Sequence, residues 1–380
     1  MAMLFDLEAL DDATANHSLE CMCKSLAEPA AGDEGIWALH DSPYLQALVE
    51  GFTQQGLATS QGMAAMLKNW FSGGWHFPVP TQFPGFGPVW PVAELPGVAA
   101  YLASKTPATM LFGDWGMLVD YLLQTHFSAT FAATNGEWLA VRSVLMGKLQ
   151  ASVPAATLAQ AGNALAAMPN TAPQVLAAFG FTRLQKDVLH YATARCTEQI
   201  VSLSDQTRHR MKSLILADIA DRMGSPAGAG PSLQSKLFDS FAELNRDWRR
   251  IAITEAGEAA NQGFVSNMAI GARIRRMEHY RGACGFCRSI DRKVFEVVAP
   301  DAPEKDGKTQ VWVGKTNLGR SASPRKKYMG SLMYREEGEL WWAAAGLQHP
   351  HCRGLWVLQD DSLSSVNDPR WAGWLASLGL

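Results

Sequence analysis

Residues 233–264 read LQSKLFDSFAELNRDWRRIAITEAGEAANQGF, and this stretch decides the fold class. Its large apolar residues follow steps of four, four, three, four and three. They are Leu233, Leu237, Phe241, Leu244, Trp248 and Ile251. This spacing places them on one stripe of an α-helix. We expect the helix to continue through residues 253–268, which predicts a mostly α protein.

Further helices are predicted on the N-terminal side of this stretch. Residues 113–127 and 137–150 carry apolar residues at helical spacing, within a predicted helical domain at 114–197. Residues 202–223 predict a helix that begins with Ser202 and Asp205 at the spacing of a cap. It belongs to a second helical region, residues 198–280.

The composition excludes several classes of protein. Of the 380 residues, 47% are hydrophobic and 18% are charged, which argues against a wholly disordered chain. The net charge of −3 argues against a polycation that coats nucleic acid. The N-terminus does not read as a signal peptide, and no long apolar stretch reads as a membrane span. We therefore expect no membrane partner.

The N-terminal part, residues 1–70, opens with an acidic arm. Residues 1–50 carry ten acidic residues and one basic residue, Lys24. Such a charge run is typical of a solvated arm. It also fits a docking arm for a basic partner surface, and the sequence leaves both interpretations open.

Residues 71–113 form a Pro- and aromatic-rich segment that is expected to be extended. Six prolines lie between Phe77 and Gly97, and proline at this density disfavours a helix. The segment either covers its own domain or lies on another subunit. The aromatic residues expected to dock there are Phe77, Phe83, Phe86 and Trp90.

Residues 281–358 predict a small α+β module, because short runs rich in Val, Phe and Trp are typical of strands. Its basic loop, residues 308–335, holds seven Lys or Arg residues and no acidic one. Five of them are expected to bind nucleic acid or an acidic protein partner: Lys315, Arg320, Arg325, Lys326 and Lys327. A solvated loop is the alternative. Residues 359–380 are expected to be a C-terminal tail.

Two pairs of residues in this module have the spacing of metal ligands. Cys284 and Cys287 form CGFC, and His349 and Cys352 form HPHC. Three thiolates and one imidazole suit tetrahedral Zn²⁺, and four protein ligands make a closed, structural site of zinc-ribbon type. The alternatives are buried inert thiols and a redox pair.

No motif for catalysis stands out. The chain has no GxSxG, HExxH or P-loop sequence. Glu255, on the long helix, could act as a base, but a buried acid there more often caps, pairs or braces a neighbouring element. We therefore expect no catalytic residue and no enzyme activity.

The order of these motifs resembles the phage Mu F-like head-morphogenesis family, the minor head proteins of tailed phages. Thr254, Glu255 and Asn261 match its Thr-Glu motif. The CxxC follows, then the strand motif at Asp291, Lys293, Val294 and Phe295, then the closing motif at His349, Pro350, Cys352 and Arg353. The resemblance covers residues 186–358. Two departures are Ile253, where the family has Arg, and Arg292, where it has Gly.

The resemblance implies a virion component inside the head, near the portal, and in the host cytoplasm during assembly. It implies a role in head morphogenesis and in DNA packaging, retention or delivery. The implied partners are the portal protein, the capsid interior, packaged DNA and a second copy of the chain. Two other readings stay open: an effector enzyme of toxin or nuclease type built on residues 1–200, and a zinc-dependent nucleic-acid-binding protein.

Overall fold

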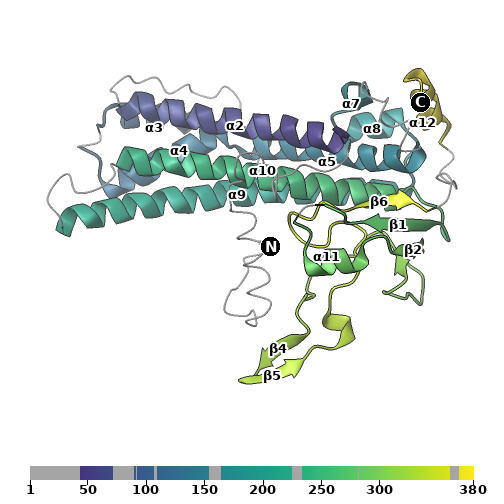
Figure 1. Cartoon of the computed structure of the whole chain (residues 1–380). Coiled ribbons are helices and arrows are strands. Elements are labelled where there is room, and N and C mark those ends of the chain that lie inside the picture. Colours follow the sequence, from purple (N-terminus) through teal and green to yellow (C-terminus); the bar gives the residue numbers. More distant parts are fainter. Residues whose placement is uncertain are drawn as a thin grey trace. The chain divides into compact units, whose positions relative to one another are not determined.

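A computed structural model describes residues 43–71, 90, 92–106, 109–153, 164–224, 233–280, 282–359 and 368–380 (Figure 1). Its helices are α2 (Pro43–Phe71), α3 (Leu95–Ala103), α4 (Phe112–His126), α5 (Ala129–Ser152), α7 (Ala164–Ala167), α8 (Ala172–Ala178), α9 (Arg183–Gly224), α10 (Leu233–Val265), α11 (Gly285–Ile290) and α12 (Pro369–Ser377), with 3₁₀ turns at Val92–Glu94 and Glu337–Glu339. The strands are β1 (Arg273–Met277), β2 (Val294–Val297), β3 (Gln310–Val311), β4 (Arg325–Tyr328), β5 (Ser331–Tyr334) and β6 (Leu355–Leu358). The prediction of a mostly helical chain with a small C-terminal sheet region is confirmed.

The chain divides into two compact units. Of the described residues, those within 43–49, 138–192 and 253–380 form unit 1, and those within 50–137 and 193–252 form unit 2. Each boundary falls inside a long helix. Within the residues described, no helix combines the length and the apolar character needed to cross a membrane.

The predicted stripe of α10 forms part of the core of unit 2. All six residues, Leu233 to Ile251, are buried. Trp248 stacks on Phe52 with ring centroids 4.7 Å apart, and its Nε1 donates a hydrogen bond to the Phe52 carbonyl at 2.6 Å. Phe127 meets the same indole edge-on. Aromatic packing of this kind adds to the gain from burial alone.

Helix α9 corrects one prediction. Ser202 and Asp205 lie inside it and do not begin it, because the helix starts at Arg183. The true start is a reciprocal cap: the Thr182 hydroxyl accepts from the Gln185 N–H, and the Gln185 side chain accepts from the Thr182 N–H. No Pro or Gly interrupts residues 183–223, so the helix continues without a break.

Unit 1 is built around a four-stranded sheet with the order β3-β2-β1-β6. Strand β1 pairs antiparallel with β2 and β6, and β2 pairs parallel with β3. The ends of α5 and α10 pack on the sheet through a core that includes Ala151, Phe264, Ile274, Phe295 and Trp356. The C-terminal half of α10 thus lies against the module that carries the predicted metal ligands.

Helices α5 and α10 approach closely within unit 1. A Cβ added at Gly147 of α5 would lie 2.0 Å from the carbonyl oxygen of Ala260 on α10. Glycine is therefore required here, because only a residue without a side chain lets the two backbones meet at this distance.

The segment predicted as a tail contains helix α12. Trp371 of this helix is buried, and Asp368 before it accepts a hydrogen bond from the Gly180 N–H. Buried Lys148 lies 3.9 Å from Asp368 and over the Trp371 ring. The described end of the chain is therefore packed on the rest of unit 1.

Candidate metal centre

The first predicted pair of ligands lies at the start of helix α11. Cys284 is the N-cap residue, and its Sγ accepts a hydrogen bond from the Cys287 N–H at 3.5 Å. Both cysteines are buried, Cys287 completely. This local turn directs the two sulfur atoms to the same point, as two-residue spacing predicts.

The second pair lies in the turn before strand β6. The Cys352 N–H donates to the His349 carbonyl at 3.1 Å, which closes the turn. His349 Nδ1 lies 2.7 Å from the Pro350 carbonyl oxygen. A carbonyl can only accept, so Nδ1 carries the proton and Nε2 presents its lone pair. Hydrogen bonds of this kind commonly orient a metal-binding histidine.

The two pairs meet. His349 Nε2 lies 3.4 Å from Cys284 Sγ and 3.3 Å from Cys287 Sγ. Tetrahedral Zn²⁺, with Zn–S of about 2.3 Å and Zn–N of about 2.0–2.1 Å, would hold a sulfur and a nitrogen about 3.5 Å apart. Cys352 is completely buried in the same cluster. The prediction that these four residues lie together is confirmed, and their donor set fits a metal ion.

The buried thiols influence one another's ionisation. Hydrogen bonding to Cys284 and to Cys352, together with burial, raises the pKa of Cys287. Burial opposes ionisation of Cys352, yet its bond from Cys287 and the nearby Arg276 charge bring its pKa well below the usual value. One thiolate is therefore already favoured where a cation would bind.

A buried ion pair lies behind Cys352. Arg276 and Glu278 are completely buried, and Arg276 Nε donates to the Glu278 carboxylate at 2.7 Å. Arg276 Nη2 lies 3.7 Å from Cys352 Sγ. Burial, and then the neighbouring Cys352, raise the pKa of Glu278 to about 7. Arg276 supplies positive charge beside a site with three potential thiolates.

Glu278 also sets a steric requirement. A Cβ added at Gly354, two residues after Cys352, would lie 2.2 Å from the Glu278 carboxylate. The glycine therefore lets strand β6 pass the buried acid at close range.

The family-motif residues join helix α10 to these turns. The Thr254 hydroxyl accepts a hydrogen bond from the His351 N–H at 3.2 Å. Asn261 accepts from the Trp356 N–H and donates to the Gly354 carbonyl. Glu255 is buried, and buried Arg353 lies over the Tyr280 ring. Three motifs that are far apart in the sequence therefore meet in unit 1.

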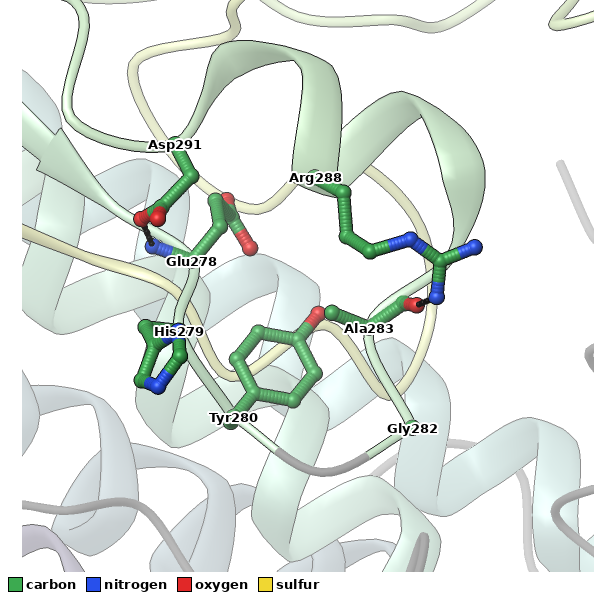
Figure 2. A pocket seen from close by; sticks show the side chains of 7 residues that line it. All are labelled: Glu278, His279, Tyr280, Gly282, Ala283, Arg288 and Asp291. Atoms are coloured by element: carbon green, nitrogen blue, oxygen red, sulfur yellow. Dashed lines mark hydrogen bonds between the residues drawn. The ribbon is translucent and has the colours of Figure 1, made fainter.

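A pocket lies in the segment that leads to the first pair of predicted ligands (Figure 2). Its lining residues are Glu278, His279, Tyr280, Gly282, Ala283, Arg288 and Asp291. Two contacts brace its walls: Asp291 accepts from the Glu278 N–H at 2.7 Å, and Arg288 donates to the Ala283 carbonyl at 2.6 Å (Figure 2). The pocket wall and the first ligand turn thus share one segment.

One basic-loop prediction is wrong. Lys315 has an exposed fraction of only 1%. Its Nζ donates to the carbonyls of Gly307 and Gln310 and lies 4.8 Å from the ring centres of Trp312 and Trp342. Charge counting placed it on the surface, but the adjacent tryptophans enclose it. Lys315 therefore cannot contact a partner in this conformation.

The other four predicted basic residues differ in exposure. Arg320 stacks on the Trp342 ring at 3.4 Å and is half-buried. Lys326 pairs with Glu339. Arg325 and Lys327 are exposed on strand β4. Of these four residues, only the last two are exposed, and Arg325 donates to the Tyr334 hydroxyl at 3.1 Å.

The predicted docking aromatics are mostly outside the described residues. Phe77, Phe83 and Phe86 lie there, so their docking stays a prediction. Trp90 is described: its backbone N–H and carbonyl both bond to the Gln124 side chain of α4. This end of the segment is thus attached to its own helical region. The prediction of an extended chain is wrong for residues 92–103, which form a 3₁₀ turn and helix α3, because Pro96 stands in the first turn of that helix, where a proline is tolerated.

Arg276, Glu278 and Glu258 are site residues that the sequence reasoning missed. Glu258 of α10 accepts a hydrogen bond from the Leu347 N–H at 2.6 Å. Arg276 lies two residues after Ile274 on β1, and Glu278 follows two residues later, directly after the strand. All three are buried, as the period of two along a strand predicts for one face. That period of two was the available signal, but their charges pointed to the surface.

A comparison with models of known protein families, with curated proteins and with solved structures found no match to this chain.

Proposed function

We propose that the chain is a structural minor head protein of a tailed phage or prophage, with a C-terminal module stapled by one zinc ion. The observation that carries the proposal is the meeting of three motifs in unit 1. Thr254 and Asn261 of the Thr-Glu motif bond to the segment after His349, which packs on the CGFC turn. In the family that these motifs resemble, they occur in this order.

Zinc is the metal that the donor set favours. Three sulfurs and one imidazole nitrogen suit Zn²⁺ better than Mg²⁺ or Ca²⁺, which prefer oxygen ligands. Cys284, Cys287, His349 and Cys352 would bind the ion. It would cross-link the α11 turn to the turn before β6. With all four positions taken by protein atoms, its role would be structural.

The proposed role in the virion is architectural. Asn261 and Glu258 attach the module to helix α10. The zinc ion would make the module rigid, and these contacts would hold the rigid module on the helix. A protein of this kind would act in head assembly and in DNA packaging, retention or delivery, with the portal as its main partner.

The test is to isolate filled heads and portal rings from the phage or induced prophage that encodes the chain. Quantitative mass spectrometry is expected to find the chain in both, at far fewer copies than the major capsid protein. A major tail protein serves as the control for carry-over. Absence of the chain from both fractions would remove the proposal.

A further inference from the structure

Hairpin β4–β5 carries large side chains that the described chain leaves uncovered. Met329, Tyr334 and Leu332 have exposed fractions of 88%, 70% and 61%. Figure 1 shows the hairpin projecting from the four-stranded sheet of its unit. A two-stranded ribbon is only marginally stable by itself, so its exposure on both faces indicates a surface made for contact.

Two exposed cations of the hairpin lie on one of its faces. Arg325 lies opposite Tyr334 and Lys327 opposite Leu332, while Lys326 lies opposite Met333. Because side chains alternate along a strand, the first two pairs share one face and the third lies on the other. Residues 325–334 contain no acidic side chain. Lys326 is paired with Glu339, so the exposed cations of the hairpin lie together on the face of Arg325 and Lys327, where they can face the phosphates of a duplex.

The tip of the ribbon is apolar at an unusual position. The connecting residues Met329 and Gly330 have φ of 49° and 80°. Tight hairpin turns with two positive φ angles favour Asn, Asp or Gly at the first position. Methionine fits that backbone poorly, yet it occupies the most exposed point of the tip. In the major groove, an apolar side chain at such a position can contact the methyl group of thymine.

We infer that hairpin β4–β5 binds duplex DNA as a two-stranded ribbon in a groove. Arg325 and Lys327 would contact phosphates, and Met329 would contact base pairs. The major groove, about 12 Å wide, admits a two-stranded ribbon. Insertion into lipid fits less well, because the outer strand edges carry backbone groups for which hydrocarbon offers no partner. This inference does not depend on a virion role.

Fluorescence anisotropy of the full chain with a labelled duplex of about 24 bp, at several salt concentrations, tests the inference. Each lost phosphate contact should reduce the slope of log K against log salt by about 0.9, so Arg325→Gln/Lys327→Gln should reduce it by about 2 and weaken binding at least about tenfold. The matched control is Arg183→Gln/Lys186→Gln, which removes two exposed charges of unit 1 on helix α9. It should bind like the parent chain.

A second variant separates apolar contact from charge. Met329→Asn removes the apolar side chain and keeps the turn, because asparagine suits this backbone conformation. The variant should bind the duplex several-fold more weakly, with an unchanged salt slope. The inference is overturned if the double variant and its control bind alike, or if a single strand binds as tightly as the duplex. It is equally overturned if the chain binds phosphatidylserine vesicles through these residues and does not bind the duplex.

Discussion

Asn261 on helix α10 accepts a hydrogen bond from the backbone N–H of Trp356 on strand β6, at 3.1 Å. The same carboxamide donates to the Gly354 carbonyl and accepts from Arg276. Asn261 is buried, so water could not replace its side chain as the partner of these polar groups. One side chain thus connects the helix, the last strand and the ion pair behind Cys352.

Asn261→Ala should therefore destabilise the chain strongly. Removing one buried partner from several polar groups costs about 1–3 kcal/mol per unsatisfied group, so a loss of about 2–4 kcal/mol in the free energy of unfolding is expected. Urea unfolding measures it. Asn69→Ala, at an exposed asparagine of helix α2, is the control and should change the stability by under about 0.5 kcal/mol. Equal stability of the two variants would contradict the assigned role.

Gly354→Ala should disrupt the module, because its new methyl group would overlap the Glu278 carboxylate. We expect a loss of about 2–4 kcal/mol, as for other overpacked buried sites. Gly285→Ala is the matched control inside the CGFC turn, since no atom lies within 4 Å of its added Cβ. Thermal unfolding of both variants checks this. A G354A variant as stable as G285A would show that β6 can shift away from the acid.

Arg292 has φ of 60°, at the position where the resembled family has Gly. A left-handed conformation costs a non-glycine residue about 1–2 kcal/mol. Glycine avoids this cost, but it loses more conformational entropy on folding, which offsets part of the gain. Its ion pair with Asp291 is exposed and adds little. Arg292→Gly should be neutral or up to about 1 kcal/mol stabilising, and Arg292→Val should destabilise. Chemical denaturation ranks the variants, and the reverse order would be contrary to this account.

Burial lowers the pKa of Lys315 to about 7 from its ordinary 10.5. Between these values the unfolded chain binds more protons at this residue than the folded chain, so stability should rise with pH. The expected gain between pH 7.5 and 9.5 is at most about 2.7 kcal/mol, and Lys315→Met should remove it. The free energy of unfolding at both pH values, for both proteins, checks this. Parallel pH profiles would mean that the carbonyls and indole rings keep Lys315 fully charged.

The sequence predicted those parts of the fold that local patterns determine. The stripe from Leu233 to Ile251 shows periodicity over several turns, and the CGFC and HPHC pairs have short, fixed spacings. The start of α9 was missed because Ser202 and Asp205 resemble a cap, while the Thr182–Gln185 cap lies further upstream.

Features that depend on contacts between distant residues could not be predicted in this way. Arg276 and Lys315 look like surface charges in the sequence, yet both are buried. Their burial depends on partners brought from elsewhere: Asn261 and Cys352 for Arg276, and Trp342 for Lys315. Charge and spacing describe a residue's own strand or loop, whereas burial is decided by the tertiary packing.

The central claim is that Cys284, Cys287, His349 and Cys352 hold one zinc ion that folds their module. Elemental analysis of the purified full chain, after expression with ample zinc, tests it most directly. We predict one zinc per chain, and the control variant Cys196→Ser should retain it. Cys352→Ser should hold less than about 0.2 zinc per chain and lose the folded module, because binding energy is folding energy at such sites. Less than about 0.2 zinc in the unaltered chain, or full zinc in Cys352→Ser, would contradict the claim.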